Sequence, residues 1–148
     1  MLLHKGKSRS STVLFVAVLA VAILAGVGTA YGLSKSPTPV VCSEGSRLGM
    51  TMYYTKGSTG VDTITQVVAA QTGGAKKYRR LRCKVGDADG YKYDNSTGII
   101  STTAMSKTWS PGTKVSHGNG FVVVYAYTGT SSTSATTLIG GIEAHTYP

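Results

Sequence analysis

The sequence predicts an all-β domain, a small sandwich or barrel of about six or seven antiparallel strands, preceded by one N-terminal hydrophobic helix. Beyond residue 40 the chain is rich in Gly, Ser, Thr, Tyr and Val and poor in Leu, Glu and Lys, which favours strands over helices. Several short runs there alternate apolar and polar residues and end at turn-forming residues. Residues 41–148, a stretch of 108 residues, have the usual size of one domain.

The chain begins with a basic stretch and continues into an uncharged one. No charged side chain occurs in residues 10–34, and residues 12–30 are almost wholly apolar. As a helix rising about 1.5 Å per residue, the apolar run would span roughly 28 Å, close to the ~30 Å hydrocarbon core of a bilayer. The basic residues before it favour a cytoplasmic N-terminus. We therefore predict a basic cytoplasmic region over 1–11, a transmembrane anchor or signal segment over 12–33, and an extracytoplasmic domain after it.

Two fates of the apolar segment remain open. Its length favours a retained anchor, because the apolar region of a cleaved signal peptide usually spans only about 7–15 residues. The small residues Gly28, Thr29 and Ala30 favour cleavage, since a signal peptidase cuts after small side chains, and the product would begin at Tyr31. The domain is thus expected either at the cell membrane or secreted after cleavage near Ala30.

Residues 34–40 are expected to form an extended linker to the domain at 41–148. Pro37 and Pro39 exclude a helix there and favour an extended conformation in the residues before them. The linker would hold the domain away from the membrane surface.

Two-residue periodicity predicts the first strands. From Leu48 to Tyr54 every second side chain is apolar, and residues 56–60 then supply a turn. Residues 61–70 form a second candidate strand with less regular alternation, and the end of this segment, over 67–71, is also compatible with a helical turn.

The run from Tyr78 to Val85 predicts a strand with one apolar and one basic face, and it follows the pair Gly73-Gly74. Successive strand side chains point to opposite sides of a sheet. One side is therefore expected to carry Arg79, Leu81, Cys83 and Val85, and the other Tyr78, Arg80, Arg82 and Lys84.

Three more strands are predicted toward the C-terminus. Residues 99–105 are one candidate, and residues 137–144 are another, with Gly140-Gly141 as a bulge. The strongest is 121–127, whose aromatic and β-branched side chains are typical of a central strand.

The Gly-Asn-Gly sequence at 118–120 suggests a hairpin turn between Val115 and Phe121. Strand tyrosines and Trp109 are expected to pack in the core and are assigned no ligand role.

Cys42 and Cys83 are the only cysteines of the chain. Because the apolar segment would deliver both to an oxidising compartment, we predict that they form a disulfide. Closing a loop of about 42 residues would stabilise the fold by roughly 4 kcal/mol in the chain-entropy estimate.

The sequence carries no signature of an active site, a cofactor or a metal. His117 and His145 are the only histidines after the apolar segment, and no Gly-x-Ser-x-Gly motif is present. Residues 87–95 partly resemble a calcium loop, but Gly98 occupies the position where an EF-hand requires a bidentate glutamate. We therefore predict a protein that is not an enzyme, with no catalytic residue, no metal site and no cofactor.

Charge is the one positive indication of function. After Ala30 the chain has twelve Lys and Arg residues against six Asp and Glu residues, a net charge of +6. The basic residues within 76–84 form a cluster, and a cluster of positive charge attracts phosphorylated or carboxylated polymers. Tyr78, Tyr91 and Tyr93 are near enough in sequence to add stacking surface. The alternative is an edge strand whose charges prevent edge-to-edge aggregation. The predicted anion-binding residues are Lys76, Lys77, Arg79, Arg80, Arg82 and Lys84.

These observations predict a membrane-anchored or surface-displayed, non-enzymatic domain. It would contact the membrane through residues 12–33 and bind an anionic polymer, a lipid head group or extracellular nucleic acid through the basic strand, or serve as a structural surface subunit able to form oligomers. The order of an apolar segment and a Ser/Thr-rich β-domain resembles, in outline, subunits of surface filaments of the pilin kind, although residues 9–31 contain no acidic residue. The alternative is a cleaved, secreted cationic effector, antimicrobial or toxin-like.

Overall fold

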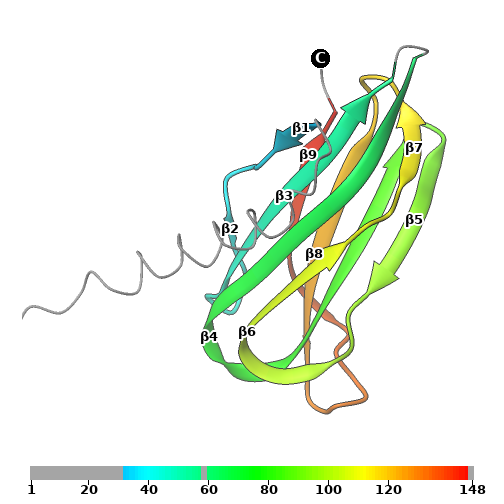
Figure 1. Cartoon of the computed structure of the whole chain (residues 1–148). Helices are drawn as coiled ribbons and strands as arrows, with labels where there is room; N and C mark the ends of the chain where they lie inside the picture. Colours follow the sequence, from blue (N-terminus) through cyan, green and yellow to red (C-terminus); the bar gives the residue numbers. More distant parts are fainter. Residues whose placement is uncertain (1–31, 58–59, 147–148) are drawn as a thin grey trace, which may run out of the picture. The chain divides into compact units, whose positions relative to one another are not determined.

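The computed structural model describes residues 32–57 and 60–146. Within these ranges the chain forms one antiparallel sheet that curls into a half-barrel (Figure 1). The all-β prediction is confirmed, and the described residues contain nine strands rather than six or seven. The strands are β1 (Leu33–Lys35), β2 (Val40–Val41), β3 (Arg47–Lys56), β4 (Val61–Asp87), β5 (Gly90–Ser96), β6 (Ile100–Trp109), β7 (Thr113–Ser116), β8 (Phe121–Gly129) and β9 (Thr137–His145).

The predicted N-terminal helix, the basic residues before it and the cleavage site after Ala30 lie outside the described residues. Among the residues that the structure does describe, no helix is long and apolar enough to cross a membrane.

Strand β4 organises the sheet. Its 27 residues join the two strands that were predicted separately over 61–70 and 78–85. The strand changes direction at Gly73 and Gly74, which adopt φ angles of +83° and +74° that residues with a β-carbon rarely take. The first half of β4 pairs with β3 and the second half with β8, so the bend folds the sheet into two layers (Figure 1).

Strands β5, β6 and β7 line the other side of β4, one after another, from its C-terminal end back to its start. The predicted hairpin at residues 118–120 is therefore wrong, because β7 and β8 do not pair with each other. β7 pairs with Val61–Ile64 and β8 with Tyr78–Gly86, so the turn between them connects the two layers.

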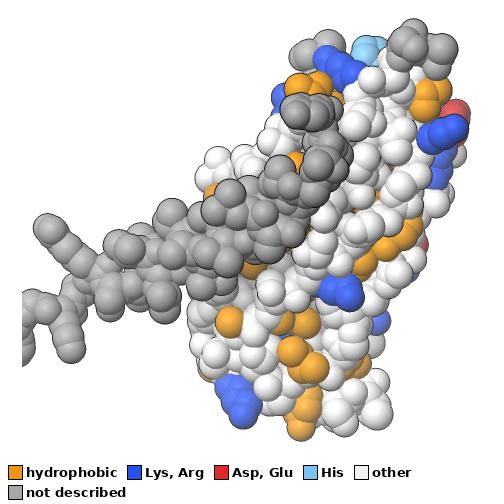
Figure 2. Space-filling view, in the orientation of Figure 1, with side chains coloured by type: hydrophobic (Ala, Val, Ile, Leu, Met, Phe, Trp, Pro, Cys, Tyr) orange, Lys and Arg blue, Asp and Glu red, His pale blue; other side chains and the backbone are white. Residues whose placement is uncertain are grey.

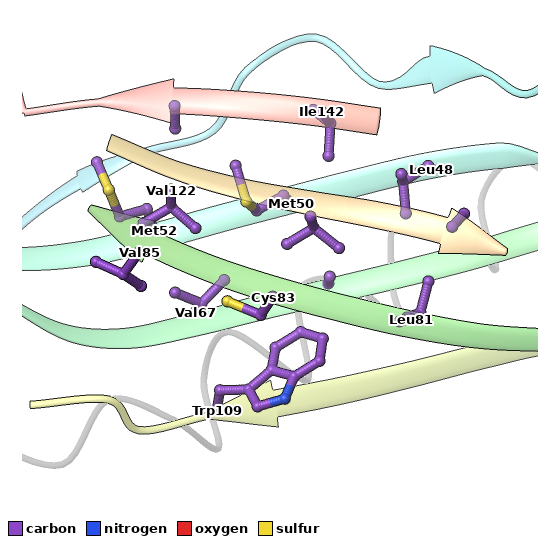
Figure 3. Close-up of a cluster of buried hydrophobic side chains, with 14 of the residues drawn as sticks. Leu48, Met50, Met52, Val67, Leu81, Cys83, Val85, Trp109, Val122 and Ile142 are labelled. Carbon is purple, nitrogen blue, oxygen red and sulfur yellow. The ribbon is translucent and has the colours of Figure 1, made fainter. Parts of the chain in front are cut away.

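The hydrophobic core lies between the layers (Figure 3). The four apolar residues that alternate from Leu48 to Tyr54 are all buried, as predicted, but the strand is not half-buried, because Gly49 and Thr51 on its other side are buried too. The inward side of the second half of β4 contributes Leu81, Cys83 and Val85, each with no exposed surface.

Residues 34–40, the predicted linker, are hydrogen-bonded to the domain at both ends. β1 pairs with Met52–Tyr54, and β2 pairs with Arg47–Leu48. The segment therefore lies along the outer edge of β3 and contributes two short strands to the sheet.

The structure does not support the predicted disulfide, because Cys42 and Cys83 are both free and buried. Cys42 lies against β9, where a β-carbon on Gly140 would come within 2.8 Å of its sulfur. Cys83 lies on β4, which is separated from β9 by β8. Two strand spacings are about 9–10 Å, whereas the α-carbons of a disulfide are about 4.4–6.8 Å apart. Burial raises the pKa of the Cys83 thiol to about 12.

Two buried aspartates hold the turn that connects the layers. Asp87 accepts hydrogen bonds from the Lys92 ammonium at 2.6 Å, from the Ser116 N–H at 2.9 Å and from the Asp89 N–H at 3.0 Å. Asp62 lies 2.9 Å from Nδ1 of His117 and accepts a 3.3 Å hydrogen bond from the N–H of the next residue, Gly118. The two aspartates stand at opposite ends of β4, and the bend brings both ends to the same turn.

These contacts lower the pKa of both carboxyl groups. The hydrogen bond from Lys92, together with bonds from Ser116 and Asp89, outweighs burial and places the pKa of Asp87 at about 2. Burial raises the pKa of Asp62, but its hydrogen bonds, that from His117 first, bring it below the ordinary value. Both groups therefore stabilise the fold in their charged form.

We expect acid to destabilise the domain through Asp87. Its unfolded carboxyl takes up a proton near about pH 4, while the folded one stays charged to about pH 2, so the free energy of unfolding should fall as the pH drops through this interval. Asp87→Asn should cost about 2 kcal/mol at neutral pH and flatten this dependence. Urea denaturation across that pH range measures both effects.

Asp89→Asn is the matched control, because Asp89 is exposed and two residues away. An Asp87→Asn variant with the stability and pH dependence of the control would contradict the assignment.

Candidate functional site

The six residues predicted to bind anions do not form one cluster. Lys76 and Lys77 are exposed at the bend of β4. Arg79 points into the protein and has no exposed surface. The other three, Arg80, Arg82 and Lys84, lie on the second half of β4 and are partly exposed.

Arg79 braces the bend. Its Nη2 donates hydrogen bonds of 2.9 Å to the carbonyl oxygens of Gly73 and Ala75 and forms an ion pair of 3.3 Å with Glu44. The inclusion of Arg79 among accessible anion-binding residues is therefore wrong. The two-residue period correctly predicted the position of Arg79 on the inward face. Its charge binds Glu44 and the carbonyl oxygens at the bend, inside the protein.

The second half of β4 is a central strand. It pairs with β5 and β6 on one side and with β8 on the other. The alternative prediction, an edge strand protected by its charges, therefore does not apply to Arg80, Arg82 and Lys84.

Register defines the surface around these three residues, because side chains directly opposite on paired strands share a face. We call this surface the outer face. Figure 2 shows one side of the molecule, on which Lys and Arg side chains are dispersed rather than gathered in one patch. The outer face carries Arg80, Arg82 and Lys84 from β4, Tyr91 and Asp94 from β5, Phe121, Val123, Tyr125 and Tyr127 from β8, and Glu143 and His145 from β9.

Two of the cations lie over tyrosine rings. The Arg80 guanidinium carbon is 4.7 Å from the centre of the Tyr127 ring, and the Lys84 ammonium is 4.3 Å from that of Tyr91. Both distances are within the range of favourable cation–π contacts, about 6 Å. Each cation is thus positioned together with an aromatic surface.

Asp94 neutralises part of the basic strand. It receives two hydrogen bonds from Arg82, 2.7 and 2.6 Å long, and lies 3.7 Å from the Lys84 ammonium. The bond to Arg82 is the main reason why the pKa of Asp94 lies below its ordinary value. Among the described residues no carboxylate pairs with Arg80, whose charge therefore remains uncompensated within the part of the chain that is seen.

Aromatic rings connect the strands of the outer face. Tyr91 meets Phe121 edge-on at 5.7 Å, and Phe121 lies 6.1 Å from His145. Tyr125 lies 6.4 Å from Tyr127, and a hydrogen bond with Tyr91, followed by burial, raises the pKa of Tyr125. We call these rings the aromatic row; it consists of two groups, one formed by Tyr91, Phe121 and His145 and the other by Tyr125 and Tyr127, with Val123 between them on β8.

Glycines lie beneath two of these rings. A β-carbon on Gly86 would come within 3.1 Å of the Phe121 ring, and one on Gly141 within 3.2 Å of the Tyr125 ring. Because neither glycine has a side chain, the two rings can approach the backbone of the sheet closely, as in aromatic rescue of strand glycines.

The aromatic residues of β8 were missed as site residues because strand tyrosines were expected in the core. That expectation is confirmed for Trp109, which is buried, but it is wrong for Tyr125 and Tyr127, which are partly exposed. The missed signal is the period of residues 121–127, in which Phe121, Val123, Tyr125 and Tyr127 share one parity and Val122, Val124 and Ala126 share the other. Of the tyrosines predicted to support the basic strand, Tyr91 contacts Lys84, whereas Tyr93 packs against the core.

His117 and Asp62 form the other notable side-chain pair. The Asp62 side chain is wholly buried, and 41% of the His117 side chain is exposed. The Asp62–His117 pair fixes the turn between the layers, so we assign it a structural role. Within the described ranges, no three His, Cys, Asp or Glu residues are grouped so as to hold a metal ion.

No protein-family model matches the chain, and a search of curated proteins finds no match. The outer face is therefore interpreted from its own geometry.

We expect Arg79→Met to destabilise the fold strongly. The substitution would leave Glu44 and the carbonyl oxygens at the bend without their partner, which costs about 3–5 kcal/mol for a buried ion pair. Arg80→Met, one residue away on the outer face, should cost about 1 kcal/mol or less. Urea denaturation of both variants tests the contrast, and equal losses would show that Arg79 does not brace the bend.

Proposed function

We propose that the protein is a non-enzymatic domain displayed outside the cytoplasmic membrane, which binds an anionic partner through the outer face. The main observation is Arg80, whose guanidinium is stacked on Tyr127 and has no carboxylate partner among the described residues. The uncharged segment over 12–33 supports the location, because its length suits a membrane anchor.

The stacking of Arg80 favours recognition of an anion. A guanidinium held against an aromatic ring loses little further conformational freedom when it binds, and its planar donors suit a carboxylate or a phosphate. Lys84 on Tyr91 adds a second positioned cation two strand repeats away, about 14 Å along β4. This spacing favours an extended polymer over a single small ion.

The binding test compares two double variants of the full chain in detergent. Arg80→Gln with Lys84→Gln should weaken binding to a carboxylated resin at low salt by about tenfold or more, since loss of about 1.4 kcal/mol corresponds to tenfold. Lys107→Gln with Lys114→Gln removes two exposed charges from β6 and β7 and should change binding less than about twofold. Melting temperatures check that both variants fold.

Equal loss of resin binding in the two double variants would mean that binding depends only on net charge. No loss of binding in either variant would show that the outer face is not the anion-binding site. A structural surface subunit, the other use of a displayed domain, would assemble without these two cations.

Cell fractionation and N-terminal sequencing test the location. For a retained anchor we expect the protein in the membrane fraction with its apolar segment intact. A free product beginning at Tyr31 would support the alternative, a secreted cationic effector, since Gly28, Thr29 and Ala30 fit a cleavage site.

A further inference from the structure

We infer that the anionic partner is an acidic polysaccharide, whose carboxylate groups bind Arg80 and whose sugar rings lie against the aromatic row of the outer face. This inference rests on the proposed function and narrows it to one chemical class.

The charge balance of the outer face argues against a densely charged ligand. Three cations, Arg80, Arg82 and Lys84, are accompanied by two carboxylates, Asp94 and Glu143, so the Lys, Arg, Asp and Glu side chains of this face sum to a charge of only +1. Affinity for polyphosphate or nucleic acid grows with the number of phosphates neutralised, because each releases bound counterions. Here the carboxylates would instead repel closely spaced phosphates.

The carboxylates and tyrosine hydroxyls suit a ligand rich in hydroxyl groups. Asp94 keeps acceptor capacity beyond its two bonds from Arg82, since a carboxylate accepts about four hydrogen bonds. Glu143 pairs with His145 at 2.5 Å, and nearly half of the Glu143 side chain is exposed. These carboxylates can accept hydrogen bonds from sugar hydroxyls. The ionised phosphates of a polyanion have no such donors.

The aromatic row supplies the apolar contact. Tyr91 has 53% of its surface exposed, and the rings of Phe121, Tyr125 and Tyr127 are partly exposed beside it. Aromatic side chains combine an apolar face with, in tyrosine, a polar end, as binding of an amphipathic sugar requires. Because Phe121 lies against Gly86 and Tyr125 lies against Gly141, little ordering of these two rings is needed on binding.

Among the described residues, the outer face has one cation without a carboxylate partner, Arg80, which indicates that the acid groups of the ligand are widely spaced. Arg80 offers one carboxylate site, while the remainder of the face offers hydroxyl-binding and apolar surface. A polymer in which acidic and neutral sugars alternate fits this distribution better than one with a charge on every unit.

The test measures binding of the full chain, in detergent, to four probes: hyaluronate, neutral dextran, long-chain polyphosphate and poly(dT). We expect hyaluronate to bind at least about tenfold more tightly than the other three. Its affinity should fall with salt at a slope near about −1, because one or two charges are neutralised. Arg80→Gln should weaken hyaluronate binding about tenfold, while the melting temperature falls by no more than about 5 °C.

A ring variant tests the aromatic surface at Tyr127, which both stacks on Arg80 and would contact the sugar. Tyr127→Leu should weaken hyaluronate binding several-fold, and Tyr127→Phe, which keeps the ring, should retain most of it. Tyr53→Leu, on β3, is the matched control and should leave binding unchanged.

The outcomes distinguish this inference from the proposed function. Tighter binding of polyphosphate or poly(dT), lost in Arg80→Gln with Lys84→Gln, would overturn the polysaccharide and leave an anion-binding domain. Equal binding of dextran and hyaluronate would overturn the acidic class. If no anionic probe responds to substitutions on the outer face, both proposals fail.

Discussion

The fold depends on the bend in β4 and on the guanidinium that holds it. Without a bend, a strand of 27 residues would extend about 90 Å and could not bury its alternate side chains against another part of the same sheet. Gly73 and Gly74 supply the backbone conformation, and Arg79 binds the carbonyl oxygens of the turned segment. The bend places Leu81 and its inward neighbours opposite the apolar face of β3. Burial of the Arg79 charge costs desolvation free energy, but its hydrogen bonds hold the bend on which the two layers depend.

The same strand builds the outer face. Its two-residue period directs Arg80, Arg82 and Lys84 outward because Leu81, Cys83 and Val85 point inward. Its central position brings an acid from β5 and aromatic rings from β8 against them. Neighbouring strands therefore decide what each cation can do: Arg82 is neutralised by Asp94, Lys84 lies between Asp94 and Tyr91, and Arg80 is stacked on a ring.

Much of the local structure could be predicted from the sequence. Alternation over 48–54 and 78–85 identified strands and their inward side chains, and the composition of residues 121–127 identified a strand, because the period of a strand is a local property. The hairpin at 118–120 was wrong because β7 and β8 pair with different halves of a distant strand. The disulfide was not supported because its two cysteines lie against different strands.

The sequence by itself determined the all-β class, the inward side chains over 48–54 and 78–85, and the presence of a basic segment. Only the tertiary structure decided how the charges of that segment are distributed: Arg79 in the interior, Arg82 on Asp94, and Arg80 on Tyr127. Alternation tells which side of a strand a residue occupies, but it carries no information on register. The partner of a charged side chain depends on the register between strands distant in sequence, and so does its capacity to bind a ligand.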